Sequence, residues 1–216
     1  PPPLPDLRNR YYLLRHGQST ANVAGIISSA RSLAGSDRHG LTLLGIEQSR
    51  QSAGQLIDAI AGDLAEDNGG DGGSSHPPQS TGRVYFVSSP FARARETAEQ
   101  CIRGIQRDDD VAGKATSLGL TIHDEIHIHD GLMERYFGRL DGMELSTYAY
   151  VWPVDMMDPT HTAFDVESVA AVCTRVREAI LELDSRYEGG GNHVVLASHA
   201  DVLQITQVYA AGLQNP

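Results

Sequence analysis

Residues 11–22 read YYLLRHGQSTAN. The first four residues are aromatic or aliphatic, a pattern that predicts a short buried strand ending at Arg15. His16 and Gly17 follow directly, so a cation and an imidazole stand where the strand ends. The tripeptide RHG occurs a second time at 38–40, in SDRHGLT. The sequence therefore raises the question of which copy belongs to a working site.

Strand patterns and helix patterns alternate along the rest of the chain. Short apolar or alternating runs occur at 84–87, 120–130 and 193–197. Apolar residues recur at helical spacing in four segments, which are 43–61, 94–105, 167–186 and the C-terminal VLQITQVYAAG. Strands that alternate with helices of this length predict an α/β fold, a three-layer α/β/α sandwich with a mostly parallel central sheet.

We expect one folded domain over residues 11–216. The preceding ten residues, PPPLPDLRNR, are rich in proline and predict an extended, mobile segment. Residues 62–82 combine Gly, Ser, Pro and acidic residues with little to bury, which predicts a flexible surface loop inside the domain. A second loop is predicted at 107–119, and its acidic run at 108–110 is interpreted as a solvated face.

Composition and charge limit the possible partners. The chain has 17 basic and 28 acidic residues and a formal net charge of -11, which speaks against nucleic acid and anionic membranes. No apolar run approaches the roughly 18 residues of a membrane span, and the N-terminus lacks a signal-peptide core. Cys101 and Cys173 lie in helical patterns and are expected to be reduced. A cytoplasmic protein is expected, and its oligomeric state is left open.

Polar residues follow each of the four predicted strands. They are Arg15-His16-Gly17, Ser88 to Arg93, Met133-Glu134-Arg135 and Ser198-His199. In a parallel sheet such residues meet at the carboxyl edge, where open α/β sheets bind ligands. Two histidines, two or three arginines and one glutamate are therefore expected to converge.

This set of side chains suits phosphoryl transfer without a metal or another cofactor. Arginines donate forked hydrogen bonds to phosphate oxygens and stabilise the charge of the transferring group. A neutral imidazole attacks phosphorus, and a carboxylic acid protonates the departing alkoxide. The substrate would bind in a local positive pocket of a negative body.

Five segments of the sequence resemble one known family. They are, in chain order, LLRHGQSTAN, LTLLGIEQSRQ, SSPFARARETA, LMERYFGRLDG and LASHADVLQ. Together they are similar to the signature segments of the histidine phosphatase superfamily, in the phosphoglycerate mutase-like proteins of its first branch. The resemblance runs from about Tyr11 to the C-terminus, and ESVAAVCTRV at 167–176 is similar to the family's GES-containing helix start.

The resemblance implies a role for each matching side chain. His16 would be the nucleophile that becomes phosphohistidine, and Glu134 would be the proton donor and later the base that activates water. The rest of the phosphate pocket would be formed by Arg15, Asn22, Arg93 and His199. Ala200 and Val166 stand where members usually have glycine, and neither change removes a catalytic side chain.

The function that the resemblance implies is hydrolysis of a small phosphomonoester through phosphohistidine. A phosphoglycerate mutase is the nearest alternative, because it shares all five segments. Mutases of this branch usually carry a longer insertion between the acid and the second histidine, whereas Glu134 and His199 are 65 residues apart here. The shorter spacing favours hydrolysis. A non-catalytic phosphate-binding or interaction module of the same fold is a further alternative, although binding alone would not require Glu134.

Three histidines in the third predicted strand raise the alternative of a metal site. His123, His127 and His129 share one face of an ideal strand, and imidazole is a common zinc ligand. The intervening Ile126 and Ile128 are explained more simply by a half-buried strand. We therefore prefer a site without metal.

The two RHG copies differ in context. No strand precedes the second copy, which leads into a helix and is interpreted as a coincidental loop tripeptide at the pocket rim. Substrate choice is assigned to the loops at 25–38 and 144–164, whose shape the sequence does not reveal. Candidate pocket walls are Tyr136, Tyr148, Tyr150 and Trp152.

Overall fold

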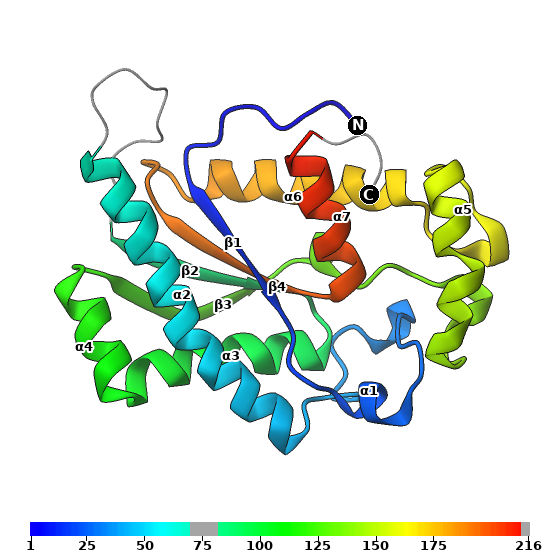
Figure 1. The fold of residues 1–216 in the computed structure, drawn as a ribbon, viewed down its shortest axis with the longest axis horizontal. Helices are drawn as coiled ribbons and strands as arrows, with labels where there is room; N and C mark the ends of the chain where they lie inside the picture. The colour runs from blue at the N-terminus through cyan, green and yellow to red at the C-terminus, as the bar shows by residue number, and fades with distance from the viewer. Residues whose placement is uncertain (70–81, 213–216) are drawn as a thin grey trace.

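The computed structural model of the protein describes residues 1–69 and 82–212. Within them, the sheet has strands β1 (Arg10–Arg15), β2 (Arg83–Ser88), β3 (Thr121–Ile128) and β4 (His193–Ser198), in the order β1-β4-β2-β3 with every pair parallel (Figure 1). The α-helices are α1 (Thr20–Ala24), α2 (Leu43–Gly69), α3 (Ala92–Arg107), α4 (Asp109–Ser117), α5 (Trp152–Met157), α6 (Val169–Arg186) and α7 (Ala200–Ala210). Short 3-10 helices are η1 (Arg31–Leu33), η2 (Asp130–Leu132), η3 (Gly138–Leu140), η4 (Leu145–Tyr150) and η5 (Ala163–Asp165). None of the helices in this part of the chain is long and apolar enough to cross a membrane.

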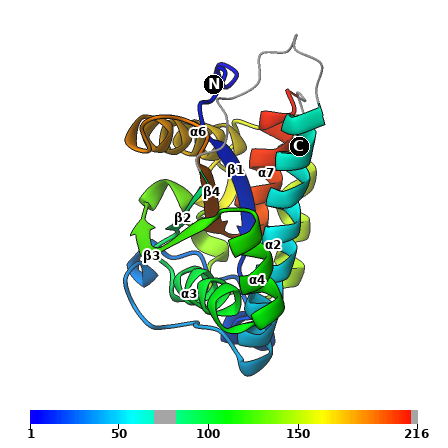
Figure 2. The ribbon, with the colours of Figure 1, turned by 90° about the vertical axis from the view of Figure 1, so that its left-hand side faces the viewer.

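Helices cover both faces of the sheet. Side chains alternate between the two faces along a strand, so Tyr12 and Leu14 of β1 pack with α2, α3 and α4. Tyr11 and Leu13 pack instead with α6 and α7. Figure 2 shows α2 and α6 on opposite sides of β1. The predicted three-layer sandwich with a parallel sheet is confirmed.

The chain between β3 and α6 forms a cap with a small core of its own. After η2, which packs on α6 and β4, it contains η3 to η5 and α5, and Figure 1 shows α5 at the end of the molecule away from α4. The buried residues of this core are Ile27, Phe137, Leu140, Val151 and Val166. Because Ile27 belongs to the loop after α1, the two loops that were assigned to substrate choice pack against each other here.

Helix α2 extends further than the sequence pattern predicted. The predicted flexible loop at 62–82 begins too early, because the chain stays helical to Gly69. Leu64 explains the difference, since it continues the apolar stripe of Ile57 and Ile60 at helical spacing and packs on the same core. The rest of the predicted loop, at 70–81, lies outside the described residues.

Residues 109–117 form helix α4, so the predicted loop at 107–119 is wrong over this range. Asp108 caps the helix by accepting hydrogen bonds from the backbone nitrogens of Asp110 at 3.1 Å and Val111 at 3.2 Å. Asp109 and Asp110 lie in the first turn, where negative charge is favourable to the helix dipole. The acidic run is exposed, as predicted, but it also starts a helix.

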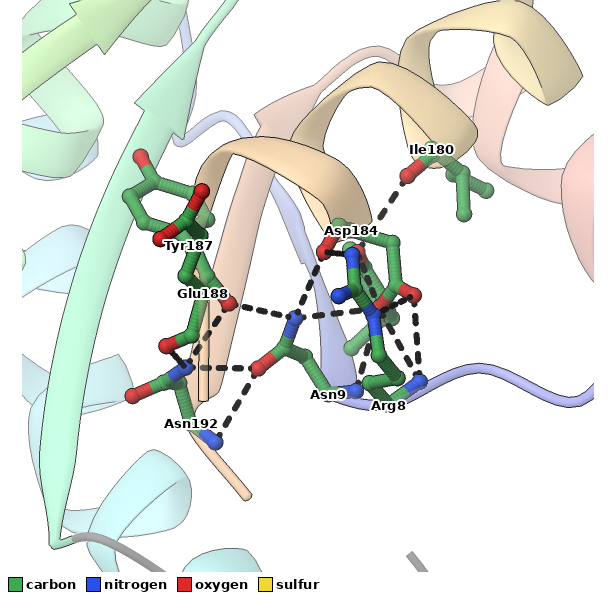
Figure 3. Close-up of polar contacts among 8 residues, drawn as sticks. Arg8, Asn9, Ile180, Asp184, Tyr187, Glu188 and Asn192 are labelled. Carbon is green, nitrogen blue, oxygen red and sulfur yellow. Dashed lines mark hydrogen bonds and ion pairs between the residues drawn. The ribbon is translucent and has the colours of Figure 1, made fainter. Parts of the chain in front are cut away.

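A buried polar network ties the N-terminal segment to α6 (Figure 3). Asp184 of α6 accepts hydrogen bonds from the backbone nitrogens of Arg8 at 3.1 Å and Asn9 at 3.0 Å, and Asn192 donates to Asn9 Oδ1 at 2.7 Å. Burial acts to raise the pKa of Asp184, but these donors outweigh it and hold the pKa below its usual range. Residues 1–9 contain neither helix nor strand, and this network holds Arg8 and Asn9 against α6.

Candidate active site

The four polar motifs meet at the carboxyl edge of the sheet. Arg15 pairs with Ser198, Ser88 pairs with Ala197, and β3 ends beside β2. His16 continues the ladder by donating its backbone N–H to the oxygen of Ser198 at 3.0 Å. The ends of all four strands lie side by side, which brings the residues after them to one place.

The tautomer of the buried His16 follows from its two neighbours. Its Nδ1 lies 2.8 Å from the carbonyl oxygen of Gly17, which only accepts, so Nδ1 carries the proton. Its Nε2 lies 3.2 Å from Nε of Arg93, which only donates, so Nε2 carries the lone pair. Glycine is needed at 17 because a Cβ there would lie 2.4 Å from the carbonyl oxygen of Gly45 in α2. The turn thus presents an unprotonated nitrogen to a cation.

Arg93, near the start of α3, joins the two site histidines. Its Nε lies 3.2 Å from both His16 Nε2 and His199 Nδ1, and its side chain is buried. Its Nη2 donates to the carbonyl oxygen of Ser28 at 2.8 Å, and its Nη1 donates to Ser28 Oγ at 3.3 Å. Burial and then the charge of Arg93 lower the pKa of His16 to about 3 and hold that of His199 well below its usual value. Both imidazoles are therefore neutral at pH 7.

His199 is fully buried and held by a serine that the sequence analysis did not single out. Since its Nδ1 accepts from Arg93, its Nε2 carries the proton and donates to Ser89 Oγ at 2.8 Å. The rings of His199 and His16 are 5.2 Å apart, centroid to centroid, and inclined by 62°. Ser89 follows β2 in the motif SSPFARARETA, so its position at a strand end was a usable signal.

Glu134 is buried in the same region, in the chain that follows η2. The backbone nitrogen of Arg135 donates to its Oε1 at 3.0 Å. Burial, together with the negative charge of Asp201, raises the pKa of Glu134 to about 7 against the opposing charge of Arg93. A carboxyl group with this pKa can both give and take a proton near neutral pH.

The side chain of Arg135 pairs with two carboxylates other than that of its neighbour Glu134. Its Nη1 and Nη2 each lie 2.7 Å from the carboxylate of Asp155 in α5, and Nη1 lies 3.2 Å from Asp201 in α7. His161 Nε2 reaches the same Asp155 carboxylate at 2.7 Å. This buried network connects the cap to Arg135, the residue after Glu134. No motif in the sequence indicated the network.

Arg15 and Asn22 are less closely tied to the other site residues than Arg93 is. With His16 they line an open cavity of about 390 Å³, whose other lining residues are Gly17, Gln18, Gln48, Ser49 and Ser52. Asn22 Oδ1 accepts from the backbone nitrogen of Ser19 at 2.9 Å, so that side chain also caps α1. Within residues 1–69 and 82–212, neither Arg15 nor Asn22 bonds to Arg93, His199 or Glu134. Arg15 and Asn22 therefore line the open cavity with His16 and stand apart from the hydrogen bonds that join Arg93, His16 and His199.

Of the three histidines in and just after β3, His127 and His129 stay neighbours, with ring centroids 6.0 Å apart, and a local irregularity lies between them and His123. Ile122 pairs with Val84 and Ile126 with Phe86, so the register shifts between them and the ideal alternation is lost. His123 stacks on Tyr85 with ring centroids 4.3 Å apart. Among the residues that the structure describes, no group of three His, Cys, Asp or Glu side chains could hold a metal ion.

The second RHG copy lies in the loop between η1 and α2, without a strand before it. His39 has a backbone φ of 58°, which is unusual for a residue other than glycine. Its Nδ1 lies 2.7 Å from Ser28 Oγ, the same oxygen that Arg93 contacts. The copy follows no strand, and through Ser28 its His39 contacts a partner of Arg93.

The family model described as histidine phosphatase superfamily, branch 1, matches residues 76–216. The match covers more than half of the chain and includes Arg93, Glu134 and His199. The chain belongs to this superfamily. Arg15 and His16 precede the matched range, and the parallel pairing of β1 with β4 places them beside the rest.

Solved structures of several proteins are similar to this histidine phosphatase superfamily member. A mycobacterial glucosyl-3-phosphoglycerate phosphatase is 22% identical, with a TM-score of 0.59 over 96% of this chain and 81% of that chain. The alpha-ribazole phosphatase from Shigella flexneri is 24% identical, with a TM-score of 0.57 over 94% and 80%. YhfR of Bacillus stearothermophilus is 20% identical, with a TM-score of 0.57 over 95% and 81%. At these identities the likeness shows the shared fold. Among curated proteins, none matches the chain in sequence.

Proposed function

We propose that this protein is a phosphomonoesterase that needs no metal and works through a phosphohistidine at His16. The observation that carries the proposal is the environment of His16 Nε2, an unprotonated nitrogen 3.2 Å from the buried cation of Arg93. A site that only bound phosphate would not need a buried carboxyl group whose pKa is raised to about 7, and Glu134 is such a group. Nucleophile, cation and acid are the three parts that phosphoryl transfer requires.

In the proposed complex, the phosphate binds where Arg93 now contacts the two imidazoles. Its oxygens replace His16 Nε2 and His199 Nδ1 as acceptors for Arg93, and this frees the lone pair of His16. Charge-assisted bonds to phosphate are stronger than bonds to a neutral imidazole, so the exchange is favourable. Arg15, whose charge acts on His16, and Asn22 complete the pocket from the open side.

The first chemical step transfers the phosphoryl group to His16. Nε2 forms a bond to phosphorus while the bond from phosphorus to the ester oxygen breaks, and Glu134 gives its proton to the departing alkoxide. Phosphohistidine and the alcohol are the products of this step. Arg93 and Arg15 stabilise the charge on the phosphoryl oxygens in the transition state.

The second step returns the site to its starting state. Glu134, now a carboxylate, takes a proton from water as the water oxygen attacks phosphorus. The bond from phosphorus to Nε2 breaks, inorganic phosphate leaves, and His16 regains its lone pair. Each group ends in the protonation state in which it began, so the cycle is closed.

The substrate class proposed is a small phosphorylated metabolite. Two proteins of similar fold are phosphatases of glucosyl-3-phosphoglycerate and of alpha-ribazole phosphate by name, which supports this class without choosing a member of it. Tyr148 and Trp152 stack at 4.8 Å between ring centroids and belong to the cap, where they are candidates for the wall that contacts the leaving group.

The proposal is tested by assaying a panel of sugar phosphates, phosphoglycerates and nucleotides in the presence of EDTA. We expect at least one compound to be hydrolysed and an acid-labile phosphoenzyme to form, and we expect His16→Ala to lose both. His123→Ala is the matched control, because His123 stacks on Tyr85 away from the site and its loss should leave the rate unchanged.

Two results would change this proposal. Wild-type protein that hydrolyses no compound of the panel and takes up no phosphoryl group would contradict an enzymatic role. Transfer of the phosphoryl group back to the substrate, in place of transfer to water, would identify a mutase.

A further inference from the structure

The second RHG copy is held in an unfavourable backbone conformation next to the site. His39 has a φ of 58°, in the left-handed region that favours glycine and asparagine. Residues other than glycine persist there when surrounding contacts hold them, and such residues cluster at functional sites. The contact that holds the His39 side chain is its hydrogen bond to Ser28, at 2.7 Å.

The direction of each hydrogen bond around Ser28 can be worked out from donor chemistry. Arg93 Nη1 only donates, so Ser28 Oγ accepts from it at 3.3 Å. The one hydrogen of the Ser28 hydroxyl is then available for His39, whose Nδ1 accepts it at 2.7 Å. Ser28 also holds Arg93 Nη2 through its carbonyl oxygen at 2.8 Å. His39, Ser28 and Arg93 therefore form one chain of bonds that continues to His16 and His199.

We propose that His39 is a positioning residue, which fixes the Ser28 hydroxyl so that Ser28 holds the guanidinium of Arg93 toward the two site histidines. This inference rests on the proposed function only where it predicts an effect of His39 on the rate of phosphoryl transfer. A hydroxyl without an acceptor for its hydrogen rotates freely, and a long arginine side chain loses much rotamer freedom when it is held. Fixing Ser28 therefore reduces the freedom of the one cation that contacts both imidazoles.

The charges around His39 are consistent with the acceptor form of its ring. Burial, then the cations of Arg38 and Arg93, lower the pKa of His39, and Asp141 opposes them. A neutral ring can leave Nδ1 unprotonated, as the bond from Ser28 requires. The second RHG copy thus acts through another residue, whereas the first supplies the nucleophile.

The first test separates the side chain of His39 from its backbone conformation. His39→Gly removes the acceptor and suits the positive φ, so the fold should keep its stability while kcat falls about tenfold, the effect of one hydrogen bond. His39→Asn tolerates the same φ and keeps an acceptor near the position of Nδ1, so it should restore most of the rate. KM should change little in either variant if the loss lies in the orientation of Arg93 during transfer.

The second test uses the serine between the two residues. Ser28→Ala removes the hydroxyl but keeps the carbonyl oxygen that binds Arg93 Nη2. If His39 acts through Ser28, the double variant Ser28→Ala with His39→Gly should be no slower than Ser28→Ala alone. The proposal would be overturned if the double variant were slower by the product of the two single effects. A His39→Gly variant as fast as the wild type would overturn it too.

A readout without substrate keeps this inference separate from the proposed function. The side-chain Nε–H signal of Arg93 can be followed by NMR and assigned by its loss in Arg93→Lys. We expect His39→Gly to shift or broaden this signal and His39→Asn to preserve it. If the wild type is inactive but the Arg93 signal changes in this way, the proposed phosphatase activity is refuted and the coupling of His39 to Arg93 is supported. If the wild type is active and the Arg93 signal is unchanged in His39→Gly, the coupling is refuted and the phosphatase proposal stands.

Discussion

At the scale of single residues, His16, Arg93 and His199 form one group in which a single N–H serves two imidazoles. Both bonds are 3.2 Å long, at the upper end of the usual range for N–H donors. A shared and lengthened bond holds each acceptor weakly. A phosphate oxygen, which carries charge, can therefore displace both nitrogens at small cost.

Glu134 offers a direct test of the acid role at this scale. Glu134→Gln keeps the size of the side chain but has no proton to give to the leaving group. We expect kcat to fall by about 10²- to 10⁴-fold, the usual effect of losing a general acid, while inorganic phosphate binds nearly as well. Steady-state kinetics measures kcat, and inhibition by inorganic phosphate measures the affinity for phosphate. A parallel loss of phosphate affinity would mean that Glu134 is a binding residue.

The pKa of Glu134 also sets the pH dependence of turnover. Because the pKa is raised to about 7 and the protonated form is needed, kcat/KM of the wild type should fall as the pH rises through this value. The remaining activity of Glu134→Gln should lack this alkaline decrease. A profile in which both proteins decrease alike above pH 7 would assign the titration to another group.

How much of the site could be predicted differed from residue to residue. The locations of His16, Arg93 and His199 follow from strand ends, because parallel strands bring their carboxyl ends together whatever the loops do. Ser28 and Asp155 could not be found in this way. Their contacts join segments far apart in the chain and depend on loop conformations for which the sequence has no periodic signal.

At the scale of elements, the two errors in helix assignment have local causes. Composition favoured a loop at 62–69, but Leu64 continues the stripe of Ile57 and Ile60, and burial of one more leucine outweighs the polar neighbours. The acidic run at 108–110 by itself indicates only a solvated face. Their position at a helix N-terminus, with Asp108 as the cap, makes the same residues stabilise a helix.

The cap of α4 gives a prediction at this scale. Asp108→Ala removes the acceptor for two backbone N–H groups and should lower the free energy of unfolding by about 0.5–2 kcal/mol. Asp109→Ala, which changes a first-turn charge but not the cap, should cost less, about 0.3–1 kcal/mol. Urea unfolding measures both, and equal effects of the two changes would argue against capping by Asp108.

The polar network at the other end of the sheet gives a prediction with a defined pH window. Asp184 accepts bonds from both backbone nitrogens of Arg8 and Asn9, so Asp184→Asn should cost about 1–3 kcal/mol at pH 7. Its folded pKa is lowered, so this stabilisation is complete above the unfolded pKa of about 3.9 and is lost as the pH falls through the folded pKa. Unfolding of both proteins at pH 7 and pH 3 should show the difference shrink at the lower pH.

At the scale of the whole molecule, a body with net charge -11 encloses two buried arginines at its functional end. Arg135 is balanced by the carboxylates of Asp155 and Asp201. Arg93 instead contacts neutral imidazoles and the neutral Ser28, so its charge is the less compensated of the two. A buried cation of this kind favours an anion beside it, which is what a phosphomonoester supplies.

The buried histidines should make the stability of the whole fold depend on pH. The folded pKa of His16 is lowered to about 3, so between this value and its unfolded pKa of about 6.5 the unfolded chain binds more protons. Its contribution to the free energy of unfolding therefore falls by about 1.4 kcal/mol for each pH unit below 6.5. Glu134 and Asp201, whose pKa values are raised, act in the opposite direction.

His16→Gln isolates this contribution, because the other groups remain. The free energy of unfolding of the variant should decrease less steeply than that of the wild type between pH 6.5 and pH 4.5. Identical slopes for the two proteins would mean that folding does not lower the pKa of His16.

In the proposed reaction His16, and not His39, carries the phosphoryl group. The most direct measurement is to quench the enzyme during turnover of a panel substrate, digest it under alkaline conditions that preserve phosphohistidine, and locate the modified peptide by mass spectrometry. We expect phosphohistidine at His16 in the wild type and in His39→Gly, and none in His16→Ala. Phosphohistidine at His39, or full turnover in His16→Ala, would contradict it.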